Sequence, residues 1–262
     1  MAKIIYKDLI NAHIEALNTS SDHRGYLGIS QLGHECDRYL YYVLHDAYRN
    51  PIPPRVARLW ERGDWEEHRI VRDLKKIGCT VTDQQKEISI FGGVIKGHID
   101  GIASGVPGAE KTKHLLEIKT MADAYWKVYC KKGIKKSNPA YWVQGQLYAG
   151  YLDLTRILFV AVNKNTEERH FERIVFEPTV VSNYEARALS VIGATDPPNR
   201  IGGVDWWTCK ICSMNGICHG NDVPNKVCRS CKYASMGVDK LTCAKGHTKS
   251  VPTGCKEWES CV

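Results

Sequence analysis

Apolar residues recur at helical spacing through the N-terminal part of the chain. Residues 4–17 show this pattern, and so do residues 55–78, which end at Gly78, a candidate helix C-cap. We predict a further helix over residues 30–46, with Ser30 as its N-cap, because the proline-rich stretch that follows would end it. The first part of the chain is therefore predicted to be helical.

The middle of the chain changes to an alternating pattern. Residues 86–104 predict two strands joined at Gly92 and Gly93, and residues 114–120 predict a third. Helical spacing then alternates with two more apolar strands, in the order helix 122–132, helix 139–153, strand 156–162, strand 170–176, helix 178–193. Regular periodicity stops after Pro198. This order predicts an α/β fold with a mixed central sheet flanked by helices and a C-terminal extension.

Composition agrees with a globular protein and draws attention to cysteine. The chain has 262 residues, a formal net charge of +7, 43% hydrophobic and 25% charged residues. It contains no apolar run of about 18 residues and no recognisable secretory signal, so we expect a cytoplasmic protein without a membrane span. Eleven cysteines, an odd number, favour reduced thiols that bind metal over a disulfide framework.

Three charged residues suggest a catalytic cluster. Glu117 and Lys119 lie two apart in a predicted strand and so leave the same face of the sheet. A turn over residues 105–108 would pair Asp100 with Glu117 across an antiparallel hairpin. Two carboxylates and an amine suit Mg²⁺ or Mn²⁺ and phosphoryl chemistry. The alternative is a cross-strand salt bridge on a solvated face.

Four sequence segments in this order resemble the RecB-like branch of the PD-(D/E)xK nuclease superfamily. They are RGDWEEH at 62–68, GHID at 97–100, LLEIKT at 115–120 and YWVQGQLY at 141–148. The resemblance implies a restriction-endonuclease-like core that hydrolyses DNA, although the proline of the family name is missing here. It assigns the following roles: metal ligands Asp100, Glu117 and His68, catalytic lysine Lys119, and Gln144 and Tyr148 beside the scissile phosphate.

A first cysteine set is formed by Cys209, Cys212, Cys218 and, far upstream, Cys36. Cys36 lies in a Ser-x-Leu…Cys-x-Arg context that is similar to the iron–sulfur nucleases of the same superfamily, the AddB type and the exonuclease of CRISPR adaptation. The resemblance implies a [4Fe–4S] cluster that staples the first helices to the chain after the nuclease core. Two alternatives stay open. The same four thiolates could bind zinc, or Cys36 could be a buried side chain that binds no metal.

A second cysteine set follows and predicts a structural zinc site. We assign Cys228, Cys231 and Cys243 as ligands, with Cys255 as the preferred fourth ahead of His247 and Cys261. The segment is too short for a core of its own, so metal would supply its folding free energy. The predicted domains are a nuclease domain over residues 1–220 and a zinc module over residues 221–262.

A lysine-rich stretch follows the strand of Glu117 directly, and aromatic residues are interleaved with it. Its members are Lys127, Lys131, Lys132, Lys135 and Lys136. Such a groove suits single-stranded DNA or duplex ends, where phosphates provide affinity and bases stack on aromatic rings. The alternative is a solvated lysine face over buried aromatic side chains.

The motifs together predict a metal-dependent DNA exonuclease of recombination, repair or end processing, encoded by a phage and acting in the host cytoplasm. A recombinase or a single-strand-binding protein is the expected protein partner. Two other functions fit the same residues. One is a non-catalytic DNA-binding or scaffold protein on a nuclease fold, and the other is a structure-specific endonuclease.

Overall fold

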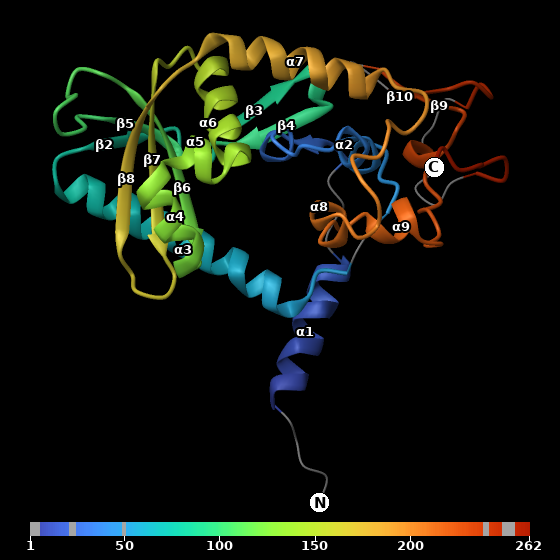
Figure 1. The fold of residues 1–262 in the computed structure, drawn as a ribbon, viewed down its shortest axis with the longest axis horizontal. Helices are drawn as coiled ribbons and strands as arrows, with labels where there is room; N and C mark the ends of the chain where they lie inside the picture. Colours follow the sequence, from blue (N-terminus) through green and yellow to red (C-terminus); the bar gives the residue numbers. More distant parts are fainter. Residues whose placement is uncertain (1–5, 21–24, 49–50, 238–240, 248–254) are drawn as a thin grey trace, which may run out of the picture.

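A five-stranded mixed sheet forms the centre of the computed structural model, which describes residues 6–20, 25–48, 51–237, 241–247 and 255–262. The strand order is β2-β5-β6-β7-β8 (Figure 1). Only the β6–β7 pair is parallel, and the other pairs are antiparallel. The strands span Thr80–Thr82 (β2), Gly101–Ser104 (β5), His114–Met121 (β6), Arg156–Asn163 (β7) and Arg169–Val175 (β8).

Helices cover both faces of this sheet. The long helix α3 (Pro54–Lys76) packs Ile70, Val71 and Leu74 on one face, against even-numbered strand residues such as Leu116 and Ile118. The other face packs on α4 (Asp123–Lys132) and α6 (Pro139–Tyr151), and the same apolar core continues into α2 (Asp37–Leu44), α5 (Ile134–Ser137) and α7 (Pro178–Ile192). Strands β6 and β7 are therefore largely buried on both sides, which explains the continuous apolar run over residues 157–162 of β7.

The predicted mixed sheet flanked by helices is thus confirmed, but the second of the two strands predicted over residues 86–104 is divided. The stretch after Gly93 forms two short strands in two different sheets, β4 (Ile95–His98) and β5. Strand β4 lies between β1 (Leu27–Gly28) and β3 (Glu87–Ile90) in a second, three-stranded sheet. The 3-10 turn η2 (Phe91–Gly93) connects β3 to β4. The chain changes sheet at Gly101, whose positive φ of 151° a side chain would strain.

The predicted helix over residues 30–46 is wrong in its first half. A short 3-10 turn η1 (Ile29–Gln31) comes first, and α2 begins only at Asp37 with Cys36 as its N-cap residue. Between them Gly33 packs on helix α6, where a Cβ would lie 2.6 Å from the Cα of Ala140. This close approach requires an irregular loop, which keeps Cys36 out of a helix.

The cysteine-rich C-terminal extension is also present, and it is built from short elements. These are α8 (Trp207–Lys210), α9 (Asn215–His219), η3 (Cys228–Ser230), β9 (Ala234–Met236) and β10 (Leu241–Cys243). It lies on the side of the molecule that carries α2 (Figure 1). The imidazole Nδ1 of His45 lies 2.8 Å from the carbonyl oxygen of Arg229, and the Asn225 N–H donates to the Ala47 carbonyl at 2.9 Å. The extension is therefore anchored on the N-terminal segment.

Helix α1 (Tyr6–Ser20) projects away from the body of the molecule (Figure 1). Among the described residues, every helix is too short or too polar to cross a membrane.

Candidate active site

The β5–β6 hairpin brings the two predicted carboxylates together. Gly101 pairs with Leu116, so that Asp100, one residue before β5, lies opposite Glu117. The backbone N–H of Ile118 donates to Asp100 Oδ2 at 2.6 Å and fixes that carboxylate against β6. The antiparallel hairpin predicted from the turn at residues 105–108 is confirmed. We refer to Asp100, Glu117 and Lys119 below as the carboxylate site.

Burial distinguishes this cluster from a surface salt bridge. Glu117 has no exposed area, and it forms an ion pair with the Nζ of Lys119, which also lies 5.3 Å from the ring centroid of Tyr141. Burial and the nearby Asp100 raise the pKa of Glu117 to about 7, although Lys119 acts in the opposite direction. The pKa of Lys119 is raised, because the two carboxylates together outweigh the effect of its burial. Lys119 is therefore a cation at neutral pH.

The carboxylate site fits a divalent cation that keeps most of its water. Apart from the ion pair with Lys119, neither Glu117 oxygen has a hydrogen-bond partner in the described chain. A buried, incompletely paired carboxylate is costly, and a hard cation would compensate it. In the described chain, no three ligand atoms here lie within 4.8 Å of one another. One or two carboxylates plus water is the arrangement that Mg²⁺ accepts.

Helix α3 adds acidic side chains that the sequence did not single out. Glu67 accepts two hydrogen bonds from Gln85 Nε2, at 2.9 and 3.0 Å, and burial together with the charge of Asp100 raises its pKa. Burial raises the pKa of Asp100 in turn, and Asp64 of the same helix contributes to that rise. The spacing of Asp64 and Glu67, one helical turn apart, puts both on one face of a helix but does not say what that face contacts.

His68, which the resemblance implies as a third metal ligand, lies on the exposed side of α3. It is exposed, its Nδ1 lies 2.7 Å from the backbone oxygen of Asp64, and within the described residues it forms no ion pair with Asp100 or Glu117. Glu67, its neighbour in the sequence, is the residue whose charge reaches both carboxylates. The position of His68 as a metal ligand therefore stays a prediction.

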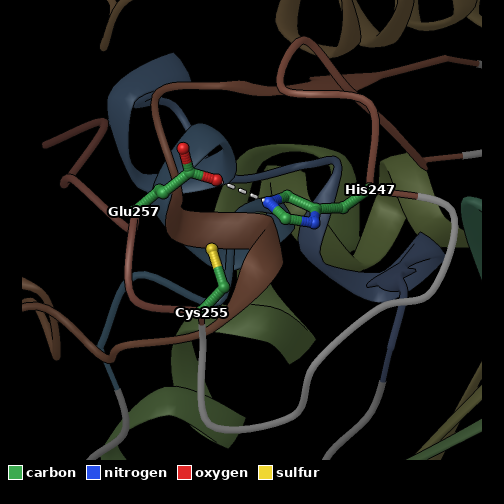
Figure 2. A group of neighbouring side chains, drawn as sticks. All are labelled: His247, Cys255 and Glu257. Atoms are coloured by element: carbon green, nitrogen blue, oxygen red, sulfur yellow. Dashed lines mark hydrogen bonds and ion pairs between the residues drawn. The ribbon is translucent and has the colours of Figure 1, made fainter.

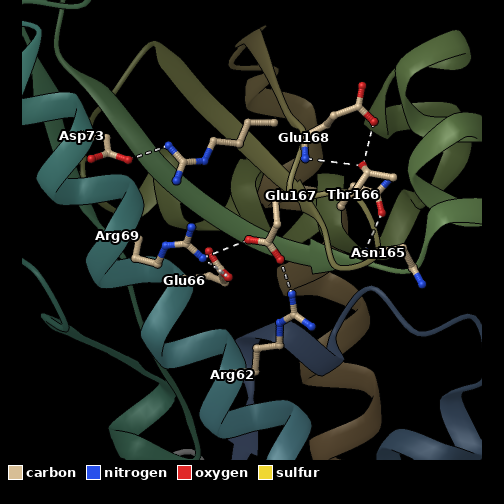
Figure 3. A network of polar contacts seen from close by, with 10 residues as sticks. Arg62, Glu66, Arg69, Asp73, Asn165, Thr166, Glu167 and Glu168 are labelled. Atoms are coloured by element: carbon tan, nitrogen blue, oxygen red, sulfur yellow. Dashed lines mark hydrogen bonds and ion pairs between the residues drawn. The ribbon is translucent and has the colours of Figure 1, made fainter.

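A polar network holds α3 in this position. Glu167, in the turn between β7 and β8, accepts from Arg62 at 2.6 Å and from Arg69 at 3.0 Å (Figure 3). Further along, Arg169 pairs with Asp73 at 2.6 Å. Because each pair is partly exposed, it contributes little stability alone, but the set fixes the rotation of the helix about its axis. That rotation turns Glu67 towards the carboxylate site.

Helix α6 places Gln144 and Tyr148 beside the same strands. Tyr148 is 2% exposed and lies across Gly97, where a Cβ would come within 2.2 Å of its hydroxyl oxygen. Burial raises the pKa of Tyr148, and Glu117 contributes to the rise, which places this ring within electrostatic range of the carboxylate site. Gln144 is 5% exposed, and its Oε1 has no partner among the described residues.

All five predicted DNA-contacting lysines are exposed, on α4 and α5, directly after β6. Two of them have acidic partners. Lys127 pairs with Asp123 at 2.7 Å, and Lys135 pairs with Glu177 at 2.7 Å while its Nζ lies 4.3 Å from the ring centroid of Trp142. The remaining three supply most of the positive charge of this face: Lys131, Lys132 and Lys136.

The structure brings the first cysteine set together from both ends of the chain. Its four members line one pocket with His34, Arg38 and Tyr39 among others. Burial raises the pKa values of Cys209 and Cys212, and the neighbouring thiols, Cys36 included, contribute to the rise. The Cys36 loop is held by Arg187 of α7, whose guanidinium donates to Leu32 O at 2.8 Å, His34 O at 2.6 Å and Asp37 Oδ1 at 2.6 Å.

The members of the second cysteine set lie beside different neighbours. As in the first set, no three of its sulfur atoms lie within 4.8 Å of one another among the described residues. Cys231 lies near Cys261, whose thiol has its pKa raised by burial and then by Cys231. Cys255 lies instead beside His247 and Glu257, in the group shown in Figure 2. Glu257 was missed by the sequence, because a single exposed acid carries no signal.

Comparison with known proteins gives a likeness of fold alone. No protein-family model and no curated protein matches the chain. Among solved structures, SSO0001 has 18% identity and a TM-score of 0.43 over 82% of this chain and 96% of its own. LHK-Exo in complex with dAMP has 17% identity and a TM-score of 0.45 over 64% and 87%.

A further structure, described as the alkaline exonuclease LHK-Exo from Laribacter hongkongensis, has 15% identity and a TM-score of 0.45. It covers 69% of this chain and 90% of its own. At such low identities and TM-scores, function has to be argued from the residues of the site.

Proposed function

We propose that this protein is a metal-dependent DNA nuclease that degrades DNA from ends. The observation that carries the proposal is the buried carboxylate site, in which Glu117, without exposed area, contacts a Lys119 that stays protonated beside Asp100. A solvated salt bridge would not bury a carboxylate completely, since the desolvation cost would exceed the gain. Retention of both carboxylates and the lysine also argues against a non-catalytic scaffold.

Each residue of the site would have a separate role in phosphodiester hydrolysis. Asp100 and Glu117 would hold Mg²⁺ or Mn²⁺, which when bound lowers the pKa of a water and polarises a phosphoryl oxygen. Lys119 is a cation and cannot accept a proton, so it would stabilise the negative charge that develops on the phosphate. Gln144 and Tyr148 would position the nucleotide at the scissile phosphate, and Glu67 would orient water.

The exposed lysines of α4 and α5 would bind the DNA backbone as it leaves the site. Tyr125, 70% exposed on α4, offers a ring on which an unpaired base can stack. Such contacts read no sequence, which suits an exonuclease of recombination, repair or end processing, here one encoded by a phage, with a recombinase or single-strand-binding protein as its partner. The substrate would be single-stranded DNA or duplex ends.

We assign the first cysteine set to a [4Fe–4S] cluster. The sulfur atoms line one pocket, yet no three of them, all described residues, lie within 4.8 Å of one another. Tetrahedral zinc, with Zn–S bonds of about 2.3 Å, needs sulfur atoms about 3.8 Å apart. The wider spacing supports a polynuclear cluster, which would tie α2 to α8 and α9 without taking part in hydrolysis.

The direct test is digestion of end-labelled linear DNA, with a covalently closed circle as the matched substrate. We expect turnover of linear DNA with Mg²⁺ or Mn²⁺, none in EDTA, and no cleavage of the circle. Lys119→Ala should lower the rate at least about 100-fold, whereas Lys232→Ala, an exposed lysine of the C-terminal extension that pairs with Glu259, should leave it within about twofold.

Other outcomes would each replace the proposal by a definite alternative. Cleavage of the circle would identify an endonuclease. Salt-dependent DNA binding without turnover, unchanged by Lys119→Ala, would identify a scaffold.

A further inference from the structure

Three metal-ligating side chains of different chemistry converge in the C-terminal extension. One ligand atom each from His247, Cys255 and Glu257 lies within 4.8 Å of the other two. Figure 2 shows the imidazole of His247 and the carboxylate of Glu257 facing each other, with the Cys255 sulfur on the same side. His247 Nε2 lies 2.7 Å from Glu257 Oε2. No other such group occurs in the part of the chain that the structure describes.

We propose that His247, Cys255 and Glu257 bind one Zn²⁺ ion, with water in the fourth position. The donor set points to zinc because a thiolate, an imidazole and a carboxylate together suit a borderline-soft cation and not Mg²⁺. This site does not depend on the nuclease activity proposed above. It replaces the four-cysteine ligand set expected from the sequence, with which it shares only Cys255.

An ordinary surface ion pair does not account for the arrangement. The side chains of His247 and Glu257 are 45% and 52% exposed, and a pair at such exposure contributes little to stability. Such a pair involves only two of the three side chains, whereas the Cys255 sulfur supplies a third ligand atom within 4.8 Å of both. Exposure instead leaves room for the ion pair to open slightly, so that a metal ion can enter between the two side chains.

The local architecture needs a link at this position. His247 follows the β9–β10 hairpin, whose strands have three residues each, and Cys255 begins the C-terminal segment. That segment is anchored at its other end, where the indole N–H of Trp258 donates to the Val227 carbonyl at 2.9 Å. Zinc would join the hairpin to this segment, and its binding free energy would add to the stability of the extension.

The second cysteine set, in contrast, already has other contacts. The Cys231 backbone pairs with Ser260 in an isolated β-bridge, and the Cys261 sulfur lies 3.7 Å from Nδ1 of His45. Cys243 takes part in the turn before His247, since its carbonyl accepts from the Gly246 N–H at 3.0 Å. These contacts are local packing and backbone bonds that persist without a metal.

The test is zinc content and zinc affinity of the full-length protein, purified without chelator. Zinc would be counted by plasma mass spectrometry, and its affinity measured by competition with a chromophoric chelator, with zinc chloride as the only added ligand. Glu257→Gln, which keeps the shape of the side chain, should weaken binding at least about tenfold, and Cys255→Ser should remove one zinc per chain. Lys256→Ala, between two ligands, is the matched control and should leave affinity unchanged.

Cys228→Ser and Cys231→Ser separate this site from the four-cysteine set. We expect both variants to keep the zinc that Glu257→Gln releases. If Cys228→Ser lost the zinc while Glu257→Gln bound it with wild-type affinity, the proposal would be overturned. Co²⁺ substitution gives a second readout that folding defects do not imitate, because the thiolate charge-transfer band should disappear in Cys255→Ser but persist in Cys228→Ser.

Discussion

The carboxylate site and the first cysteine set position their candidate metal ligands by opposite means. Asp100 and Glu117 are fixed by the backbone pairing of β5 with β6, in a sheet that is covered on both faces. The cysteines come from a loop, two short helices and distant parts of the chain, and side-chain bonds such as those of Arg187 position them.

This difference separates chemistry from stability. The sheet holds the carboxylates in place whether or not a metal is bound, so loss of a carboxylate should remove activity and leave the fold intact. The cysteine region has few buried apolar residues of its own, so loss of a thiolate should unfold it without touching the reacting atoms. The predictions below test this separation, from the largest expected effect to the smallest.

Glu117→Gln should have the largest effect, a fall of at least about 1000-fold in kcat. The amide cannot compensate a cation as the carboxylate does, although it has the same shape. Thermal stability should change little, because the raised pKa of Glu117 marks its charged form as costly in the fold, and Asp100 still compensates the charge of Lys119. The measurements are single-turnover digestion of linear DNA and Tm, with the exposed Glu168→Gln as control. A Tm lowered as much as the activity would contradict the separation.

The same contrast explains how far the sequence could predict the molecule. The alternation of β6 and the turn before it determine which residues face each other, so Asp100, Glu117 and Lys119 could be grouped without coordinates. Glu67 could not, because its direction depends on the rotation of α3, which side chains far away in the sequence fix. Cys36 was joined to the C-terminal cysteines by resemblance alone, since no local pattern connects residues so far apart.

Cys36→Ser should produce the converse result. We expect loss of iron, of the brown colour that a cluster gives, and of about 10 °C in Tm, because a thiolate staple between distant segments is opened. Activity at low temperature should fall much less than in Glu117→Gln. Cys130→Ser, a half-buried thiol outside both sets, is the control. Iron content equal to that of the wild type would show that Cys36 is no ligand.

His45 should give the anchoring of the extension a pH dependence. Burial lowers the pKa of His45 to about 4. The hydrogen bond with the Arg229 carbonyl opposes this lowering, and the positive charge of Arg229 increases it. Tyr41 and Cys261 also contact the imidazole ring. Below pH 6.5 the unfolded chain binds a proton that the folded chain does not, so stability falls as pH falls. The loss should be about 2 kcal/mol between pH 7.5 and 5.

Urea unfolding at the two pH values measures this effect, and His45→Gln is the comparison. The variant should be less stable at pH 7.5 but should lack this part of the pH dependence. An identical slope in both proteins would mean that His45 does not titrate in the folding reaction.

The smallest effect is expected on the α3 side of the carboxylate site. There the structure favours Glu67, and the sequence resemblance favours His68, as the residue that assists the two carboxylates. Glu67→Gln should lower kcat about tenfold, because its carboxylate lies within electrostatic range of Asp100 and Glu117 and can orient water there. His68→Ala should change kcat less, since the exposed ring contacts the helix backbone. Rates measured across a range of Mn²⁺ concentrations distinguish the two residues. If His68→Ala required more Mn²⁺ and Glu67→Gln did not, the histidine would be the metal ligand, as the sequence resemblance implies.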